Sequence, residues 1–251
     1  DEEKYHEPLI HPAMSLSGQR KDILVLGGGE GLAVREIIKY KDVEKVTVVD
    51  LDPVMTELAK HNPIITKINQ NAMVDLKVEV KNQDAFTFIE NSEEFYDVIF
   101  VDLPDPNSVA LSRLYSREFY SLCQRRLNKY GIIVTQASSP VHSPNSFVCI
   151  IKTMESADFT VLPYHNNIPT LGEWGWCLGM RKGVVTNKML KERVAEIELP
   201  PPPTKFLNND AIVSMVNFGK GVLDKKERVK VNTILDPIIV KYYKKGAWDV
   251  Y

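Results

Sequence analysis

The chain alternates short β-branched runs with segments of helical periodicity, and this alternation limits the folds it can adopt. Apolar residues recur at spacings of three and four between most of the predicted strands. Strands and helices in such alternation pack as a mostly parallel, twisted sheet with helices on both faces, so we expect an α/β fold. The predicted strands cover residues 22–27, 45–51, 76–80, 96–103, 131–137, 159–164 and 174–180.

Composition narrows the classes of protein. With 251 residues, 44% of them hydrophobic, the chain can bury a sizeable core. A net charge of −2 gives no basic surface for nucleic acid, so we expect no nucleic-acid partner, and "KYYKK" at 241–245 is interpreted as a solvated helix face. No apolar run approaches the roughly 18 to 20 residues of a membrane span, and the isolated cysteines favour a reduced, cytoplasmic setting.

The chain is expected to have three parts. Residues 1–20 form an entry segment, residues 21–185 the α/β domain, and residues 186–251 a linker with a small, mainly helical tail. The proline run in "ELPPPPTKF" marks the linker. Because ligands of parallel α/β sheets bind beyond the carboxyl ends of the strands, those ends are where we look for functional residues.

A glycine-rich loop, "LGGGEG", follows the first predicted strand. A dinucleotide-binding loop would need a glycine where this chain has Leu32, and no GK[ST] follows as in a phosphate-binding loop. Glu30 would repel a phosphate but attract a cation. Gly27, Gly29 and Gly31 followed by a helix instead suit the Rossmann-like fold of S-adenosylmethionine-dependent methyltransferases, with an uncharged or cationic ligand.

Acidic residues follow the next two strands. Asp50 ends the second strand, where a carboxylate can accept hydrogen bonds from both ribose hydroxyls. Asp52 is expected to cap a helix that starts at Pro53. Asp84 could accept a hydrogen bond from an adenine amino group or cap the helix "AFTFIEN", and the sequence leaves both readings open. Together these positions predict a nucleoside site.

The fourth strand ends in an acidic turn. Asp102 is followed by Pro104, Asp105 and Pro106, and proline restricts both its own φ and the preceding residue. With Glu30 at the same rim, three carboxylates without a histidine or cysteine ligand predict a pocket for a cationic substrate, and we expect no metal. A pair of turn-forming aspartates on a surface loop is the alternative.

These motifs together resemble the polyamine aminopropyltransferase family, the spermidine synthases and their relatives. The resemblance implies transfer of the aminopropyl group of decarboxylated S-adenosylmethionine to a polyamine such as putrescine, giving spermidine and methylthioadenosine. It also implies that the enzyme is a homodimer. It extends to about residue 180 and rests on "DEEKYHEPLIHP", "GGGEG", "VVDLDP", "NQDAF", "VDLPDP", "LYSREFY" and "IPTLGEWGW".

The resemblance also assigns roles to residues. Asp50 would bind ribose, Glu30 the aminopropyl ammonium, and Asp102 and Asp105 would form a gate loop over the reacting groups. A carboxylate such as Asp105 can take the proton of the attacking amine. The implied cofactor contacts are Gly27, Gly29, Glu30, Gly31, Asp50, Asp84 and Ala85. The implied substrate contacts are Tyr5, His6, Glu30, Asp102, Asp105, Glu173 and Trp174, of which Asp105, Asp102 and Tyr5 would be catalytic.

The chain departs from the family pattern in three ways. Glu30 stands where the family usually has aspartate, and Leu171 replaces the amine-binding tyrosine after "IPT", which leaves the acceptor amine undetermined. The family's N-terminal β-hairpin domain does not precede the motifs, and relatives with "VDLPDP" are often fused to membrane helices. We therefore expect a cytoplasmic domain tethered through a segment outside this chain. An amine N-methyltransferase and a catalytically inactive polyamine-binding domain are the alternatives.

Overall fold

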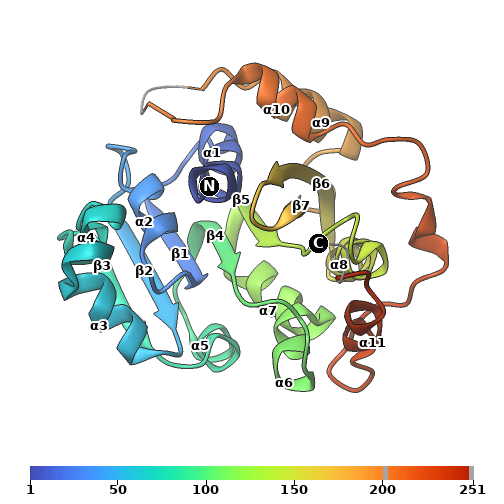
Figure 1. Cartoon of the computed structure of the whole chain (residues 1–251), viewed down its shortest axis with the longest axis horizontal. Coiled ribbons are helices and arrows are strands. Elements are labelled where there is room, and N and C mark those ends of the chain that lie inside the picture. Colours follow the sequence, from blue (N-terminus) through green and yellow to red (C-terminus); the bar gives the residue numbers. More distant parts are fainter. Residues whose placement is uncertain (200–202, 249–251) are drawn as a thin grey trace.

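The structure is a computed structural model that describes residues 1–199 and 203–248. These residues fold around a single twisted sheet (Figure 1). Within these ranges its strands lie in the order β3-β2-β1-β4-β5-β7-β6. The strands are β1 (Asp22–Gly27), β2 (Lys45–Asp50), β3 (Val78–Asn82), β4 (Tyr96–Asp102), β5 (Leu127–Gln136), β6 (Phe159–Ile168) and β7 (Gly172–Arg181).

Strands β1 to β5 pair in parallel, whereas β7 runs antiparallel to both β5 and β6. The expected mostly parallel α/β sheet is therefore confirmed. β6 and β7 are longer than predicted because they continue as a hairpin, in which Ile168 pairs with Gly172. Periodicity missed this extension because the hairpin end is polar.

Helices cover both faces of the sheet (Figure 1). The helices are α1 (Glu3–Leu16), α2 (Leu32–Ile37), α3 (Pro53–His61), α4 (Pro63–Asn69), α5 (Ala85–Asn91), α6 (Val109–Ser112), α7 (Arg117–Arg126), α8 (Pro144–Ser156), α9 (Asn187–Ala195), α10 (Asn209–Met215) and α11 (Ile238–Lys244). Short 3₁₀ turns are η1 (Ala72–Val74), η2 (Arg113–Tyr115) and η3 (Asp224–Glu227).

Alternate residues of the central strands serve the two halves of the core, because side chains of a strand point to opposite faces. Ile23 and Val25 of β1 belong to the apolar cluster that includes residues of α1, α2, α9 and α10. Leu24 and Leu26 belong to the cluster that includes residues of α5, α7, α8 and α11. This two-sided burial holds the ends of β1, β2 and β4 at a fixed common edge.

From α9 and α10 the C-terminal part runs down the right-hand side of the view to α11, which lies beside α6 and α8 (Figure 1). Lys241 and Lys244 of α11 are exposed, in line with the predicted solvated face. Tyr243 is not part of that face, because its hydroxyl contacts Asp105. Three prolines of the predicted linker, residues 200–202, lie outside the described residues. Among the helices of the described ranges, none has both the length and the apolar character that crossing a bilayer requires.

Candidate active site

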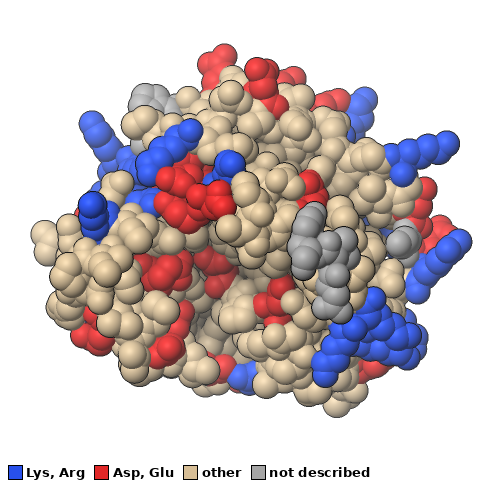
Figure 2. All heavy atoms as spheres, in the orientation of Figure 1, with Lys and Arg blue, Asp and Glu red and all other residues tan. Residues whose placement is uncertain are grey.

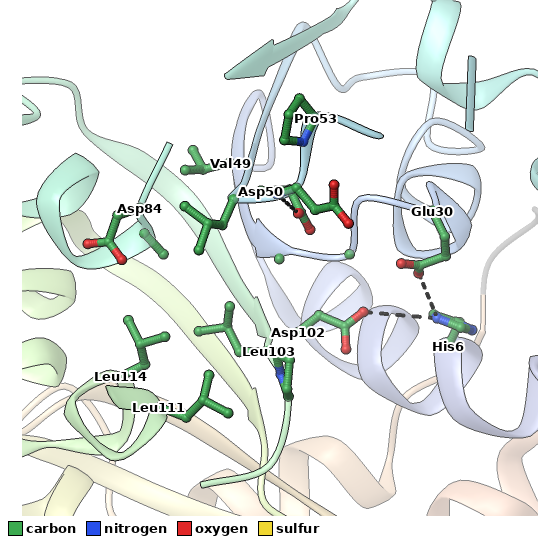
Figure 3. Close-up of a pocket in the computed structure, with 16 residues that line it drawn as sticks. His6, Glu30, Val49, Asp50, Pro53, Asp84, Asp102, Leu103, Leu111 and Leu114 are labelled. Carbon is green, nitrogen blue, oxygen red and sulfur yellow. Dashed lines mark hydrogen bonds and ion pairs between the residues drawn. The ribbon is translucent and has the colours of Figure 1, made fainter. Parts of the chain in front are cut away.

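A cavity of about 660 Å³ opens at the carboxyl ends of β1, β2 and β4. Acidic side chains gather around the hollow on this face of the molecule (Figure 2). None of the described residues that line the cavity is Lys or Arg. They are His6, Gly27, Gly28, Glu30, Val49, Asp50, Leu51, Asp52, Pro53, Asp84, Ala85, Asp102, Leu103, Pro104, Leu111 and Leu114 (Figure 3).

The glycine loop fits closely against the end of β4. Gly27 has a φ of +87°, and a Cβ atom there would lie 2.0 Å from the carbonyl oxygen of Asp102. The next amide, that of Gly28, donates to the same oxygen at 3.1 Å. Only glycine permits both the left-handed conformation and this close approach. The loop therefore places its backbone, and Glu30 with it, beside Asp102.

Asp50 is fixed by two backbone amides at the end of β2. Its carboxylate accepts hydrogen bonds from Gly29 at 2.9 Å and from Asp52 at 2.8 Å. Each oxygen keeps a second lone pair that can accept a ribose hydroxyl in the cavity. Asp52 caps α3 through the amide of Val54 at 2.9 Å, which confirms its predicted role.

Asp84 lies at the end of the cavity opposite His6 and Glu30 (Figure 3). Ala85, which follows it in the chain, also lines the cavity. It caps α5 by accepting the amide hydrogen of Thr87 at 2.9 Å, so the capping interpretation is confirmed. Its second oxygen pairs with Arg113, whose guanidinium lies 5.6 Å from the ring centroid of Phe86. The adenine contact stays a prediction, and Arg113 is a neighbour that the sequence did not indicate.

His6 of α1 reaches into the cavity between Glu30 and Asp102 (Figure 3). Its Nε2 lies 3.4 Å from Oε1 of Glu30 and 4.0 Å from Oδ2 of Asp102. Its Nδ1 lies 2.9 Å from the carbonyl oxygen of Glu2 and 3.4 Å from that residue's carboxylate. By themselves, the motifs indicate no histidine beside the three acids, whereas the family resemblance implies His6 as a substrate contact. The structure brings His6 to Glu30 and Asp102 because α1 packs its first turn against the loop.

This arrangement sets the charges of the cluster. Burial by itself would lower the pKa of His6, but the carboxylates of Glu2, Glu30 and Asp102 raise it to about 10, so the imidazole is protonated at neutral pH. Burial and the charge of Glu30 raise the pKa of Asp102 to about 6, against the opposing effects of His6 and Tyr5. Burial would raise the pKa of Glu30, but His6 lowers it overall.

Tyr5 completes the cluster from α1. Its hydroxyl donates to Oδ1 of Asp102 at 2.7 Å, and its ring centroid lies 5.5 Å from that of Trp176 on β7. Burial and the Asp102 charge raise the pKa of Tyr5 well above its usual value, so it remains a donor at neutral pH. The sequence-predicted pair Tyr5 and His6 therefore contacts Asp102 from the same helical turn.

The ligand atoms of His6, Glu30 and Asp102 all lie within 4.8 Å of one another, a spacing that a metal ion can use. A metal would have to displace the proton that these carboxylates hold on His6. The expected lack of a metal stays a prediction.

Asp105 has different surroundings from Glu30 and Asp102. It is absent from the described residues that line the cavity, although its neighbour Pro104 lines it. Its oxygens accept hydrogen bonds from Gln136 at 3.2 Å and from Tyr243 at 2.9 Å. Burial raises the pKa of Asp105, and the hydrogen bonds from Tyr243 and Gln136 partly offset this rise. Glu30 and Asp102 therefore flank His6, while Asp105 stands on the adjoining turn.

The sequence interpretation missed three residues that contact Asp105 or His6, namely Gln136, Glu2 and Tyr243. Gln136 has a recognisable signal, because it is a polar residue at the carboxyl end of the buried strand β5. Glu2 lies four residues before His6 on the same helical face and also binds Arg35 at 2.7 and 2.8 Å. Tyr243 has no comparable local signal, because it reaches Asp105 from 138 residues away in the chain.

Glu173 and Trp174 lie outside the described lining of the cavity. Glu173 pairs with His165 across the β6–β7 hairpin. Trp174 is 9% exposed and belongs to the apolar core. Leu171, at the tip of the same hairpin, is 44% exposed. The predicted amine contacts of Glu173 and Trp174 stay predictions.

Comparison with known proteins identifies the family. The sequence profile of the spermine/spermidine synthase domain matches residues 2–191. Polyamine aminopropyltransferases from Oceanobacillus iheyensis and Leptospira interrogans are 41% and 37% identical to the chain, over 100% and 97% of its length. The chain spans 48% and 46% of those two proteins, about half the length of each.

Solved structures agree on the fold. Spermidine synthase from Thermotoga maritima superimposes with a TM-score of 0.75 at 23% identity, over 90% of this chain and 75% of that one. A spermidine synthase in complex with the transition state analogue AdoDATO gives the same TM-score over 91% of this chain and 76% of that one. The chain therefore has the Rossmann-like, methyltransferase-type fold and belongs to the spermine/spermidine synthase family.

Proposed function

We propose that the chain is an aminopropyltransferase domain that moves the aminopropyl group of decarboxylated S-adenosylmethionine to a polyamine. The observation that carries this proposal is the content of one cavity. Asp50 and Asp84 offer acceptors for a nucleoside at one end, and Glu30 with Asp102 offers negative charge at the other. A ligand that is a nucleoside at one end and a cation at the other matches both.

The nucleoside would lie along the ends of β1, β2 and β4. Asp50 would accept the ribose hydroxyls, and Ala85 with Leu114 would give the base an apolar surface, because all three residues line the cavity. Asp84 would share its carboxylate between the amide of Thr87, Arg113 and the adenine amino group. Glu30 would then accept the ammonium of the aminopropyl chain.

The reaction is an in-line displacement at carbon. The acceptor amine has a pKa near 10 in water, so its ammonium must first give a proton to the enzyme. The freed lone pair attacks the methylene next to the sulfonium, the new C–N bond forms as the C–S bond breaks, and the bonding pair stays on sulfur. Neutral methylthioadenosine leaves, and the product amine carries the positive charge.

Two observations favour Asp102 over Asp105 as the group that takes the proton. Asp102 lines the cavity and receives a hydrogen bond from Tyr5, and its pKa of about 6 is close to the working pH. Asp105 lies on the adjoining turn, where its charge can hold the ammonium group of the polyamine that does not react. This division differs from the sequence interpretation, in which Asp105 accepts the proton.

The choice of donor tests the proposal first. Intact S-adenosylmethionine would bring a carboxylate toward Glu30, a repulsion of about 1 to 4 kcal/mol at a few ångströms and an effective dielectric near 20. We therefore expect decarboxylated S-adenosylmethionine and methylthioadenosine to bind at least about tenfold more tightly than S-adenosylmethionine in calorimetry. Equal or reversed affinities would contradict the proposal and favour an N-methyltransferase.

The homodimer and the membrane tether that the family resemblance implies stay proposals of the same kind. Light scattering on the purified chain would test the dimer, for which a mass near twice 28.5 kDa is expected and 28.5 kDa would contradict it. The acceptor amine is equally open and is best addressed with a panel of putrescine, cadaverine, agmatine and spermidine.

A further inference from the structure

The carboxylate of Asp105 is oriented by two donors from separate parts of the chain. The side-chain amide of Gln136, at the end of β5, donates to Oδ1 at 3.2 Å. The hydroxyl of Tyr243, on α11, donates to Oδ2 at 2.9 Å. Pro104 and Pro106 stiffen the turn on either side. With a donor on each oxygen, the carboxylate has one defined direction.

The helix that carries Tyr243 is anchored before and after this residue. Ile239 is fully buried, and its amide donates to Asn232, whose buried side chain in turn bonds the carbonyl oxygens of Ser112 and Tyr115 at 2.8 and 3.0 Å. After the helix, the amide of Ala247 donates to the carbonyl oxygen of His142 at 2.8 Å. The position of Tyr243 is thus set by the tail's packing against the α/β domain.

The ring of Tyr243 is also held from its own segment. The indole nitrogen of Trp248 donates to the carbonyl oxygen of Tyr243 at 2.9 Å, and the two ring centroids lie 4.6 Å apart. A methyl group on Gly246 would approach within 2.6 Å of that indole nitrogen, so the turn after α11 is closely packed. Tyr243 therefore has little freedom to leave Asp105.

We propose that Tyr243 is a positioning residue, through which the C-terminal segment orients Asp105 toward the non-reacting ammonium group of the acceptor polyamine. This rests on the proposed function and deepens it, because it makes part of the acceptor site depend on residues beyond 191, where the family match ends. The segment from Asn232 to Trp248 then serves substrate binding as well as packing.

The groups that face Asp105 determine what removal of this hydroxyl should do. They are Tyr243 from α11, Gln136 and Ser138 at the end of β5, and Tyr115 from η2. None of them is a cation. Burial raises the pKa of Asp105, and the Tyr243 hydroxyl opposes that rise. Without the hydroxyl, we expect the pKa of Asp105 to rise further and its carboxylate to lose its fixed direction.

Tyr243→Phe tests the proposal, and Tyr242→Phe is its matched control. Tyr242 directly precedes Tyr243 on the same helix. Its hydroxyl accepts the amide hydrogen of Lys230 at 3.1 Å, away from Asp105. In steady-state assays with decarboxylated S-adenosylmethionine, Tyr243→Phe should raise KM for the amine by about tenfold. This is the effect expected when a misoriented Asp105 no longer makes its charge-assisted hydrogen bond with the ammonium group of the amine. KM for the donor and the melting temperature should change little, and Tyr242→Phe should resemble the wild type.

A second readout does not depend on turnover. Titration of the Asp105 carboxyl carbon by NMR in protein labelled at aspartate should show a higher pKa in Tyr243→Phe than in the wild type and in Tyr242→Phe. An unchanged Asp105 titration would overturn the positioning role, and so would equal losses of amine affinity in both variants. A wild type without turnover would contradict the proposed function alone, since the titration still decides whether Tyr243 acts on Asp105.

Discussion

At the scale of single residues, the site works through unequal charges within a small space. His6 is held protonated between Glu30 and Asp102, and this cation offsets one of the two carboxylates. Asp102 is left with a pKa of about 6 and a hydrogen bond from Tyr5. A carboxylate with a pKa near neutrality is ionised enough at pH 7 to accept a proton and basic enough to hold it briefly.

The pH dependence of Asp102→Asn follows from that pKa. In the wild type, kcat/KM should fall about tenfold per pH unit below roughly pH 6, because a protonated Asp102 cannot take the proton of the amine. Asp102→Asn should lose about two to four orders of magnitude in single-turnover rate. It should also lose the acidic limb of the pH profile, that is, the fall of kcat/KM below about pH 6.

Asp105→Asn is the comparison. It should raise KM for the amine and keep the limb, because Asp105 binds the substrate without exchanging the proton in this assignment. If Asp105→Asn removes the limb while Asp102→Asn keeps more than about a tenth of the rate, the two aspartates exchange roles.

Local signals and non-local contacts explain how much of the site the sequence could indicate. Asp50, Asp52 and Asp102 each follow a recognisable buried strand, so their place at one edge of the sheet was predictable. The contact of His6 with Glu30 joins two elements whose packing no local pattern encodes. The same holds for Tyr243, which lies in a segment with Lys241, Lys244 and Lys245, residues typical of a solvated surface.

At the scale of elements, the site depends on how closely the glycine loop meets the end of β4. Gly27 combines a φ of +87° with a Cβ position 2.0 Å from the carbonyl oxygen of Asp102. Gly183 has a φ of +89° with nothing within 4 Å, and Gly18 has nothing within 4 Å and no positive φ. Substitutions at the three glycines therefore distinguish the cost of a strained backbone from the cost of a steric clash of the new Cβ atom with its neighbours.

Alanine at these three glycines should give graded losses of stability. Gly18→Ala should be close to neutral, and Gly183→Ala should cost about 1 kcal/mol of unfolding free energy through strain alone. Gly27→Ala should cost more than Gly183→Ala, because the loop and β4 must also move apart, and it should weaken methylthioadenosine binding. Urea unfolding with calorimetry measures both effects, and a Gly27→Ala variant as stable as Gly183→Ala would contradict the close packing at Asp102.

At the scale of the whole molecule, the fold brings the proposed nucleoside subsite, the acidic residues around His6 and a C-terminal helix to one edge of the sheet. The parallel strands and their helices were predictable because their periodicity is local. The course of the tail was not, since residues 203–248 return to α6 and α8 through contacts between residues far apart in the sequence, such as Asn232 with Ser112. In the proposed function, these parts together transfer an aminopropyl group.

Mass analysis of the products shows which group, if any, the protein transfers. The purified chain is incubated with decarboxylated S-adenosylmethionine and, separately, with S-adenosylmethionine, each with the amine panel, beside an Asp102→Asn control. We predict methylthioadenosine and an aminopropylated amine in equal amounts from the decarboxylated donor, and no product from S-adenosylmethionine. A methylated amine from S-adenosylmethionine, or tight binding of both substrates without any product, would contradict the account.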